Sequence, residues 1–431
     1  MINDVQSWVI PKTRSSERRF HLRSTSKVNH NGEAPPVTCS SSSIDNNKNT
    51  AGAVVWWSDD EFQDWFYHEL KEEAGPILHQ TYGDELFVDL SHCVTKWRQR
   101  YRMGNNNDRN DADDDQQVSM ESGDRRVDGG IWKRLFKRDR VVKEVLESIP
   151  IIHAIDKYVR SMPPPPSDEG GLNKNKITIV DLCSGKGYLS MILSEYLPPD
   201  KVEKFVLIDK AWPMCHAEPK PHHINWDHIY GSYTTAEDGT ELKSYFSTWP
   251  IPLHTSKQNL KKTSDMRRLQ QRLGQTSTGP CFVLGVHLCG TLSIQAVQMF
   301  YSVPSIHGLI LKPCCLPGMA YEKQQTHFQA GKYAFPTKEV CSPGYWKKKE
   351  WEGPPRWHLQ GKFDAWCRHL HEAMKYVSDS DVGVVTKLLE APVQTNGGFQ
   401  NTFLFAQKEP MTDLMWDEIE RSELTLKQLQ E

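Results

Sequence analysis

The stretch that decides the fold covers residues 177–188 and reads ITIVDLCSGKGY. Its first four residues are β-branched, which favours a buried strand, and Asp181 stands where that strand approaches its end. Gly185 and Gly187 allow a tight turn and a close approach of the backbone to a ligand. The helix predicted from Gly187 to Tyr196 then presents unpaired N–H groups to that ligand. The stretch therefore predicts a strand–loop–helix unit that binds a cofactor.

An acid follows at the expected distance. The apolar strand predicted over residues 204–209 ends at Asp209, whose carboxylate is placed to accept hydrogen bonds from a ribose diol. A nicotinamide-binding loop needs a third glycine at position 190, where this chain has Ser190. The combination favours S-adenosylmethionine, the methyl donor of methyltransferases, with its amino-acid end at the helix N-terminus. The alternative is a degenerate Rossmann-like domain without a ligand.

Three further residues belong to this predicted cofactor site. Cys183 stands where many methyltransferases carry glycine, so it narrows the turn. Gln258 and Asn259 follow the predicted third strand, and an amide there can pair with the edge of adenine. The alternative for these two amides is a solvated loop.

Strand and helix patterns alternate along the C-terminal two thirds of the chain, which predicts a parallel sheet with helices on both faces. The last two strands are joined by residues 394–398, QTNGG, a hairpin signal. This pattern resembles the seven-stranded Rossmann-like methyltransferase fold. The expected class is therefore α/β: a doubly wound, mostly parallel, seven-stranded sheet with a terminal antiparallel hairpin, preceded by a small helical region. The predicted strands are 177–182, 204–209, 251–255, 281–286, 308–311, 382–390 and 399–406.

Composition divides the chain into parts with different expected structure. The expected parts are a disordered N-terminal tail (1–52), a helical region (53–102), a disordered acidic and Asn-rich insertion (103–130), a methyltransferase domain (131–408) with a lid insertion (319–362), and a helical C-terminal tail (409–431).

The charge balance excludes a global attraction to nucleic acid. The 52 basic and 55 acidic side chains give a formal net charge of −3, so any such contact needs a local patch. No apolar run approaches the roughly 20 residues of a membrane span, so no membrane contact is expected. The ten cysteines are interpreted as reduced thiols, which predicts a cytoplasmic protein. A nuclear location is an alternative, as is an organelle if the Arg-, Lys- and Ser-rich first 30 residues are a transit segment.

Two cysteine motifs follow the predicted fourth and fifth strands, VHLCGT at residues 286–291 and LKPCCLPG at residues 311–318. Both lie at the carboxyl edge of a doubly wound sheet, where ligands bind. This edge would bring together His287, Cys289, Lys312, Cys314 and Cys315.

Three interpretations of this cluster stay open. It shapes an acceptor pocket with His287 as general base, it binds a metal through thiolates and imidazole, or its cysteines are structural. We assign His287, Cys289, Lys312 and Cys314 to the acceptor side and assign no metal. Lys312 would lower the pKa of an acceptor hydroxyl or serve as a salt-bridge partner.

The paired motifs His-Leu-Cys-Gly and Cys-Cys resemble a methyltransferase-domain family that includes eukaryotic tRNA ribose 2′-O-methyltransferases, over roughly residues 130–408. The resemblance implies S-adenosylmethionine as cofactor. The tRNA enzymes follow Cys-Cys with His-His and carry N-terminal zinc fingers, whereas this chain has Leu316-Pro317 and only Cys39 and Cys93 before Trp132. The resemblance is therefore not extended to tRNA specificity.

The lid insertion interleaves cations with aromatic residues between positions 332 and 362. Cations pair with phosphates and aromatic faces stack on unpaired bases, so RNA is the favoured acceptor. The alternative is that the aromatics pack the insertion onto the sheet. The predicted function is thus an S-adenosylmethionine-dependent methyltransferase acting on RNA. The rivals are a methyltransferase acting on protein or a small molecule, and a catalytically silent Rossmann scaffold.

Overall fold

The computed structural model describes residues 58–103, 126–162, 176–214, 219–231, 245–276, 279–347, 350–376, 383–393, 401–408 and 413–430. The predicted N-terminal tail, residues 104–125 of the predicted insertion and the predicted hairpin turn lie outside these ranges. Within the described ranges, no helix has the length and apolar character needed to cross a membrane.

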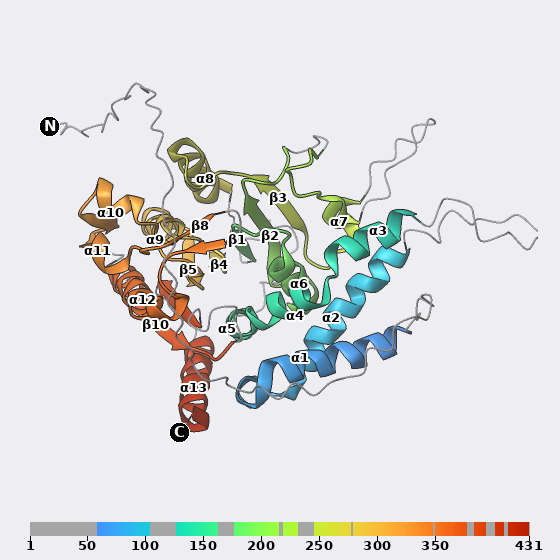
Figure 1. Cartoon of the computed structure of the whole chain (residues 1–431). Helices are drawn as coiled ribbons and strands as arrows, with labels where there is room; N and C mark the ends of the chain where they lie inside the picture. Colours follow the sequence, from blue (N-terminus) through green and yellow to red (C-terminus); the bar gives the residue numbers. More distant parts are fainter. Residues whose placement is uncertain are drawn as a thin grey trace, which may run out of the picture. The chain divides into compact units, whose positions relative to one another are not determined.

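A seven-stranded sheet lies at the centre of the fold (Figure 1). Its order is β10-β11-β5-β4-β1-β2-β3, and β11 runs antiparallel to both of its neighbours while the other pairs are parallel. The predicted fold class is therefore confirmed. The strands are β1 (Ile177–Leu182), β2 (Val202–Asp209), β3 (Leu253–Lys257), β4 (Cys281–Gly285), β5 (Ile306–Leu311), β10 (Val384–Glu390) and β11 (Thr402–Lys408).

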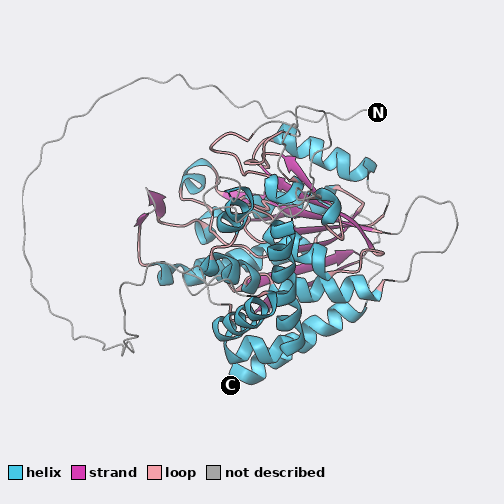
Figure 2. Cartoon of the chain, turned by 90° about the vertical axis from the view of Figure 1, so that its right-hand side faces the viewer, coloured by secondary structure: helices cyan, strands magenta, loops and turns pink. Residues whose placement is uncertain are grey.

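The sheet separates two hydrophobic cores, and alternate residues of β1 enter different ones. Ile177 and Ile179 belong to one cluster, Val180 and Leu182 to the other, because successive side chains of a strand point to opposite faces. Helices cover both faces, as Figure 1 shows, and Figure 2 shows the strands as one layer bordered by helices. The first face carries α4 (Arg138–Leu146), α5 (Ile149–Ser161), α6 (Tyr188–Tyr196) and α13 (Asp413–Gln430), and the second carries α8 (Thr263–Thr276), α9 (Leu292–Ser302) and α12 (Gln360–Lys375).

Two long N-terminal helices pack on the first face, α1 (Asp59–Tyr82) and α2 (Asp84–Met103). Ser58 begins α1 with a capping box. The Ser58 hydroxyl accepts from the Glu61 N–H, and the Glu61 carboxylate accepts from the Ser58 N–H. The third helix, α3 (Arg126–Leu135), begins inside the range that we predicted as a disordered insertion. Ile131 and Leu135 of α3 are buried against the same core, which gives this short helix its stability.

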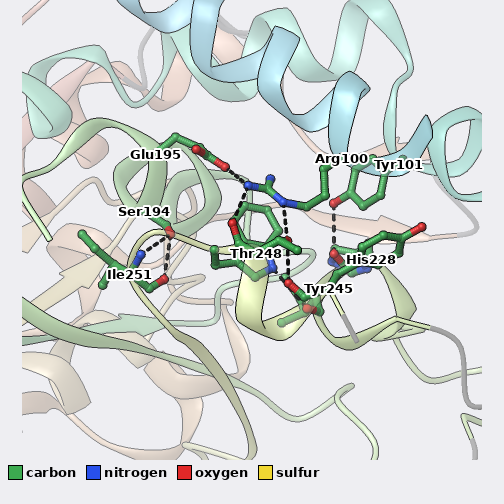
Figure 3. A network of polar contacts seen from close by, with 10 residues as sticks. Arg100, Tyr101, Ser194, Glu195, His228, Tyr245, Thr248 and Ile251 are labelled. Carbon is green, nitrogen blue, oxygen red and sulfur yellow. Dashed lines mark hydrogen bonds and ion pairs between the residues drawn. The ribbon is translucent and has the colours of Figure 1, made fainter. Parts of the chain in front are cut away.

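A buried arginine joins α2 to the sheet domain (Figure 3). Arg100 forms an ion pair with Glu195 of α6, and its Nε donates to Thr248 Oγ1 at 2.8 Å. Its guanidinium lies 3.8 Å from the ring centroid of Trp249. The neighbouring Tyr101 hydroxyl donates to the His228 carbonyl at 3.0 Å. These contacts anchor α2 to α6 through Glu195 and to the connection between β2 and β3 through Thr248, Trp249 and His228.

The strand β3 begins two residues later than predicted. Pro252 has no N–H to donate to a sheet ladder, and the strand therefore starts at Leu253. The Pro252 carbonyl still accepts from the Phe205 N–H. The predicted lid range contains short elements that the sequence patterns did not indicate. These are α10 (Ala320–Gln324), β6 (His327–Ala330), β7 (Tyr333–Pro336), α11 (Thr337–Val340), β8 (Tyr345–Lys347), β9 (Glu350–Glu352) and η3 (Arg356–Leu359). Two further short elements, α7 (Asp227–Tyr230) and η2 (Phe246–Thr248), lie between β2 and β3.

Candidate active site at the carboxyl edge of the sheet

The loop after β1, residues 183–187, is here called the glycine loop. Three of its residues have positive φ: Cys183 at 56°, Gly185 at 56° and Gly187 at 85°. Cys183 is the one non-glycine residue with positive φ in the described part of the chain. Many methyltransferases have glycine at this position, and glycine adopts positive φ more readily than cysteine. A Cβ on Gly187 would lie 2.4 Å from Leu207 Cδ2, so a side chain at the start of α6 would require both a disfavoured φ and a shift of Leu207.

Two acids lie next to the glycine loop and make different contacts. Asp181 is buried and accepts a hydrogen bond from the Ser190 hydroxyl at 2.8 Å, and burial raises the pKa of Asp181 to about 7. Asp209, at the end of β2, accepts from the Gly185 N–H at 3.2 Å and from the Ala211 N–H at 2.8 Å. Asp209 therefore spans the glycine loop and the turn after β2, the place predicted for it.

The two predicted adenine contacts have different surroundings. Gln258 is buried, its backbone N–H donates to the Asp209 carbonyl at 3.2 Å, and its Oε1 has no hydrogen-bond partner among the described residues. Asn259 instead accepts from the Lys261 N–H through its own Oδ1 at 3.1 Å, a turn that leads into α8. Of the two amides, Gln258 is the one that offers an unused buried acceptor beside Asp209.

The ends of β4 and β5 carry an array of basic and acidic side chains. His287 Nε2 lies 3.0 Å from Glu144 Oε2, and Lys312 Nζ lies 3.6 Å from Glu147 Oε1. His287 Nε2 is also 3.8 Å from Glu147 Oε2, so the Glu147 carboxylate lies between the imidazole and the ammonium group. Lys312 is fully buried, while the His287 side chain is 36% exposed. Solvent therefore reaches the array at His287 and not at Lys312.

Charge and burial act together on this array. Burial opposes ionisation of Glu144, but the hydrogen bond and charge of His287 outweigh it and lower the pKa of this carboxyl. Burial also lowers the pKa of Lys312, although Glu147 opposes this shift. The array therefore pairs each buried charge with an opposite one, as buried charges require.

No sequence motif indicated a role for Glu144 and Glu147. They lie three residues apart at the end of α4, a spacing that places them on one helix face. The helix pattern was visible in the sequence, but nothing in it indicated that this face meets the ends of β4 and β5. The pairing is a property of the tertiary fold.

Three cysteines meet beside this array. Cys289 Sγ lies 3.4 Å from Cys314 Sγ, and Cys314 Sγ lies 3.7 Å from Cys315 Sγ. None of them forms a disulfide. The structure therefore brings together all five residues that the two cysteine motifs were expected to place at one edge.

Among the described side chains of the lid insertion, several aromatic residues pack inward. Phe335 is buried in the second core, Tyr333 stacks on Tyr376, and Trp351 donates to the Pro354 carbonyl at 2.7 Å. Tyr345 is the exposed large aromatic of the described lid residues, at 53% exposure. This arrangement is the alternative that we stated for the lid, in which its aromatics pack the insertion against the domain.

A basic cluster lies closer to the glycine loop, formed by Arg134, Lys137, Arg140 and Lys186. Lys137 and Arg140 are exposed, and Lys186 is half-buried in the loop itself. Burial, together with the charges of the other three, lowers the pKa of Lys186 to about 8. Four basic side chains therefore lie at or near the glycine loop, and Arg134 and Arg140 also form ion pairs with Asp227 and Glu144.

Comparison with known proteins agrees with this geometry. Residues 143–322 match a family model described as "Methyltransferase domain". The match contains β1 to β5, the glycine loop, Asp209 and both cysteine motifs. No curated protein matches the chain. Residues 143–322 are therefore similar to the methyltransferase domains that this family model describes.

Proposed function

We propose that this domain transfers a methyl group from S-adenosylmethionine to an acceptor on RNA. The observation that carries the proposal is the meeting of two sets of residues at one sheet edge. The glycine loop, Asp209 and Gln258 form one set, and the array of His287, Lys312 and their glutamates forms the other. A cofactor end and a proton-accepting end then lie along one edge, the usual place for ligands in such sheets.

The residues of the first set fit the cofactor. Asp209 supplies carboxylate oxygens for the ribose diol, and the orphaned Oε1 of Gln258 is a buried acceptor suited to an amino group such as that of adenine. The N-terminus of α6 offers backbone N–H groups to a carboxylate. When bound, S-adenosylmethionine supplies a methyl group on a positively charged sulfur.

The residues of the second set supply the base. His287 holds Glu144 through Nε2, which fixes the orientation of the ring and leaves Nδ1 for the acceptor proton. Glu144 thus serves as the positioning residue for His287, as a carboxylate does in other base-orienting pairs. Lys312 and Glu147 are the buried pair of this array.

RNA is favoured as acceptor by the basic cluster. Exposed cations beside the glycine loop attract phosphates, and a histidine base suits a ribose hydroxyl or a base amine. The inward packing of the lid aromatics removes one argument for RNA, so the charge of this cluster now supports the acceptor class.

The proposal is tested in two steps with the purified full chain. Calorimetry should detect S-adenosylmethionine binding to the wild type and at least about tenfold weaker binding to Asp209→Ala, because one such contact contributes over 1 kcal/mol. Incubation with labelled cofactor and separated cellular RNA and protein should then label RNA. The variant His287→Ala should lose at least about a hundredfold in rate while it keeps cofactor affinity, since general bases contribute that much.

The exposed His327 of β6 is the matched control, and His327→Ala should retain full activity. Failure of the wild type to bind the cofactor would refute methyl transfer. Binding without any transfer would indicate a silent scaffold. Label in the protein fraction alone would assign the acceptor to protein instead of RNA.

A further inference from the structure

The three sulfur atoms of Cys289, Cys314 and Cys315 form a compact group at the sheet edge. All three lie within 4.8 Å of one another. The Cys289–Cys314 and Cys314–Cys315 separations are 3.4 and 3.7 Å. Sulfur atoms that face each other at such distances across two different strand ends form a donor set for a soft metal ion.

The backbone holds this group in place. Cys289 and Cys315 pair in a parallel bridge that extends the β4–β5 ladder, and the Gly290 N–H donates to the Cys315 carbonyl at 3.2 Å. Gly290 has φ of 56°, which turns the chain directly after Cys289. Cys314 and Cys315 are adjacent in sequence, so one bridge positions all three thiols before any ion binds.

The distances match one ion closely. With Zn–S bonds of about 2.3 Å, two sulfur ligands of a tetrahedral zinc lie about 3.8 Å apart. Two of the three sulfur–sulfur separations, 3.4 and 3.7 Å, lie near this value, and the third is within 4.8 Å. An all-sulfur set excludes Mg²⁺ and Ca²⁺, which need oxygen ligands. Cys289 is exposed, so the fourth corner of the tetrahedron can be reached from solvent.

We propose that Cys289, Cys314 and Cys315 bind one Zn²⁺ ion, with a water molecule or the acceptor as fourth ligand. Three protein ligands and one exchangeable position are the arrangement of zinc ions that take part in reactions, whereas structural zinc has four protein ligands. Zinc binding displaces the thiol protons to solvent. It ties the segment after β4 to the segment after β5, and these segments carry His287 and Lys312. This site goes beyond the proposed function, because no step of cofactor binding requires it.

The test measures metal on the full chain, independently of activity. Protein purified with a reductant, stripped with a chelator and dialysed against Zn²⁺ should hold one zinc per chain by atomic emission. Cobalt(II) in place of zinc should give the intense thiolate-to-metal absorption of tetrahedral cobalt. Cys289→Ser and Cys315→Ser should each bind at least about tenfold less tightly, because a ligand is lost.

Cys341→Ser is the matched control, since Cys341 is a buried free thiol in the same part of the chain outside the group. It should keep the full zinc content. A thiol reagent gives a second measurement that needs no variant: chelation of wild-type protein should increase the reactive thiols, and added zinc should reverse this. Zinc content equal in all variants, no zinc in reduced wild-type protein, or a disulfide within the group in freshly reduced protein would overturn the proposal.

Discussion

Gly187 is the residue of the glycine loop that tolerates a side chain least. Its φ of 85° disfavours any L-residue, and a Cβ would lie 2.4 Å from Leu207 Cδ2. We expect Gly187→Ala to lower the free energy of unfolding by about 1–3 kcal/mol, the usual cost of overpacking. The same change should weaken cofactor binding, because α6 starts at this residue. Urea unfolding and calorimetry measure the two effects.

Gly274 of α8 provides the control for that substitution. It has ordinary helical geometry, is exposed, and has open space around the position of a Cβ. Gly274→Ala should therefore be neutral or stabilising by up to about 1 kcal/mol. Equal destabilisation by the two substitutions would contradict the special role of Gly187.

His228 makes the stability of the glycine loop depend on pH. Its Nε2–H donates to the Lys186 carbonyl at 2.9 Å, and burial lowers the pKa of His228 from 6.5 to about 4, against the opposing charge of Asp227. Arg134 and Lys186 face it as well and favour the neutral ring. Above pH 6.5 both folded and unfolded states hold the neutral ring, so its full contribution to stability is present.

As the pH falls from about 6.5 towards 4, the unfolded state binds a proton that the folded state rejects. The free energy of unfolding should then fall by up to about 1.4 kcal/mol per pH unit from this residue. His228→Gln keeps an N–H donor but does not titrate, so its unfolding curves should show a shallower loss over this window. Parallel pH profiles for wild type and His228→Gln would rule out the assignment.

Between elements, the ion pair of Arg100 and Glu195 connects α2 to α6. The side chains are 8% and 2% exposed, so removal of one partner leaves the other charge buried. We expect Arg100→Leu to lower the free energy of unfolding by about 3–5 kcal/mol. Chemical denaturation followed by tryptophan fluorescence measures the loss, since Trp249 lies against this guanidinium.

The double variant Arg100→Leu/Glu195→Leu separates the pair from its surroundings. With no charge left unpaired, it should recover most of the stability lost by Arg100→Leu. A double variant as unstable as the sum of both single variants would show that the two residues act independently.

The sheet could be predicted from the sequence because its signals are local. The β-branched run before Asp181 predicts β1, and the two glycines predict the turn after it. The alternation of strands and helices predicts that most neighbouring strands run parallel. The expected meeting of His287 with Lys312 followed from the carboxyl-edge rule alone. The same rule does not predict the positions of Glu144 and Glu147. These positions depend on how α4 packs next to the ends of β4 and β5, and no local sequence pattern indicates that tertiary contact.

The lid shows where a local pattern leaves two interpretations open. Its alternation of cations and aromatics fits an RNA surface or a packed insertion, and Phe335 is buried in the second core. Short strands such as β6 and β7 pair only with each other, and their hydrophobic pattern covers four residues each. Runs of this length do not distinguish a binding surface from a packed hairpin.

Across the described chain, the N-terminal helices support the glycine loop from outside. Lys186 Nζ donates to the Arg134 carbonyl at 2.6 Å, and the Tyr188 hydroxyl donates to the Leu135 carbonyl at 2.7 Å. The end of α3 is thus tied to the loop on both sides of Gly187. The helix α3 therefore holds the loop, and Arg134 near its end belongs to the basic cluster.

This arrangement makes a prediction about salt and charge. Lys137 begins α4, is exposed, and makes no side-chain capping bond, so Lys137→Glu should leave the fold intact. If RNA phosphates meet the basic cluster, this variant should raise KM for RNA several-fold at low salt and leave kcat unchanged. The dependence of log KM on log salt should become shallower by about 1, because about one phosphate contact is lost. At high salt the KM values of wild type and Lys137→Glu should become equal, since screening removes the difference.

Arg267→Glu, an equal change of charge on the exposed face of α8, should alter none of these values. Equal effects of both reversals would mean that net charge, and not this cluster, attracts the acceptor.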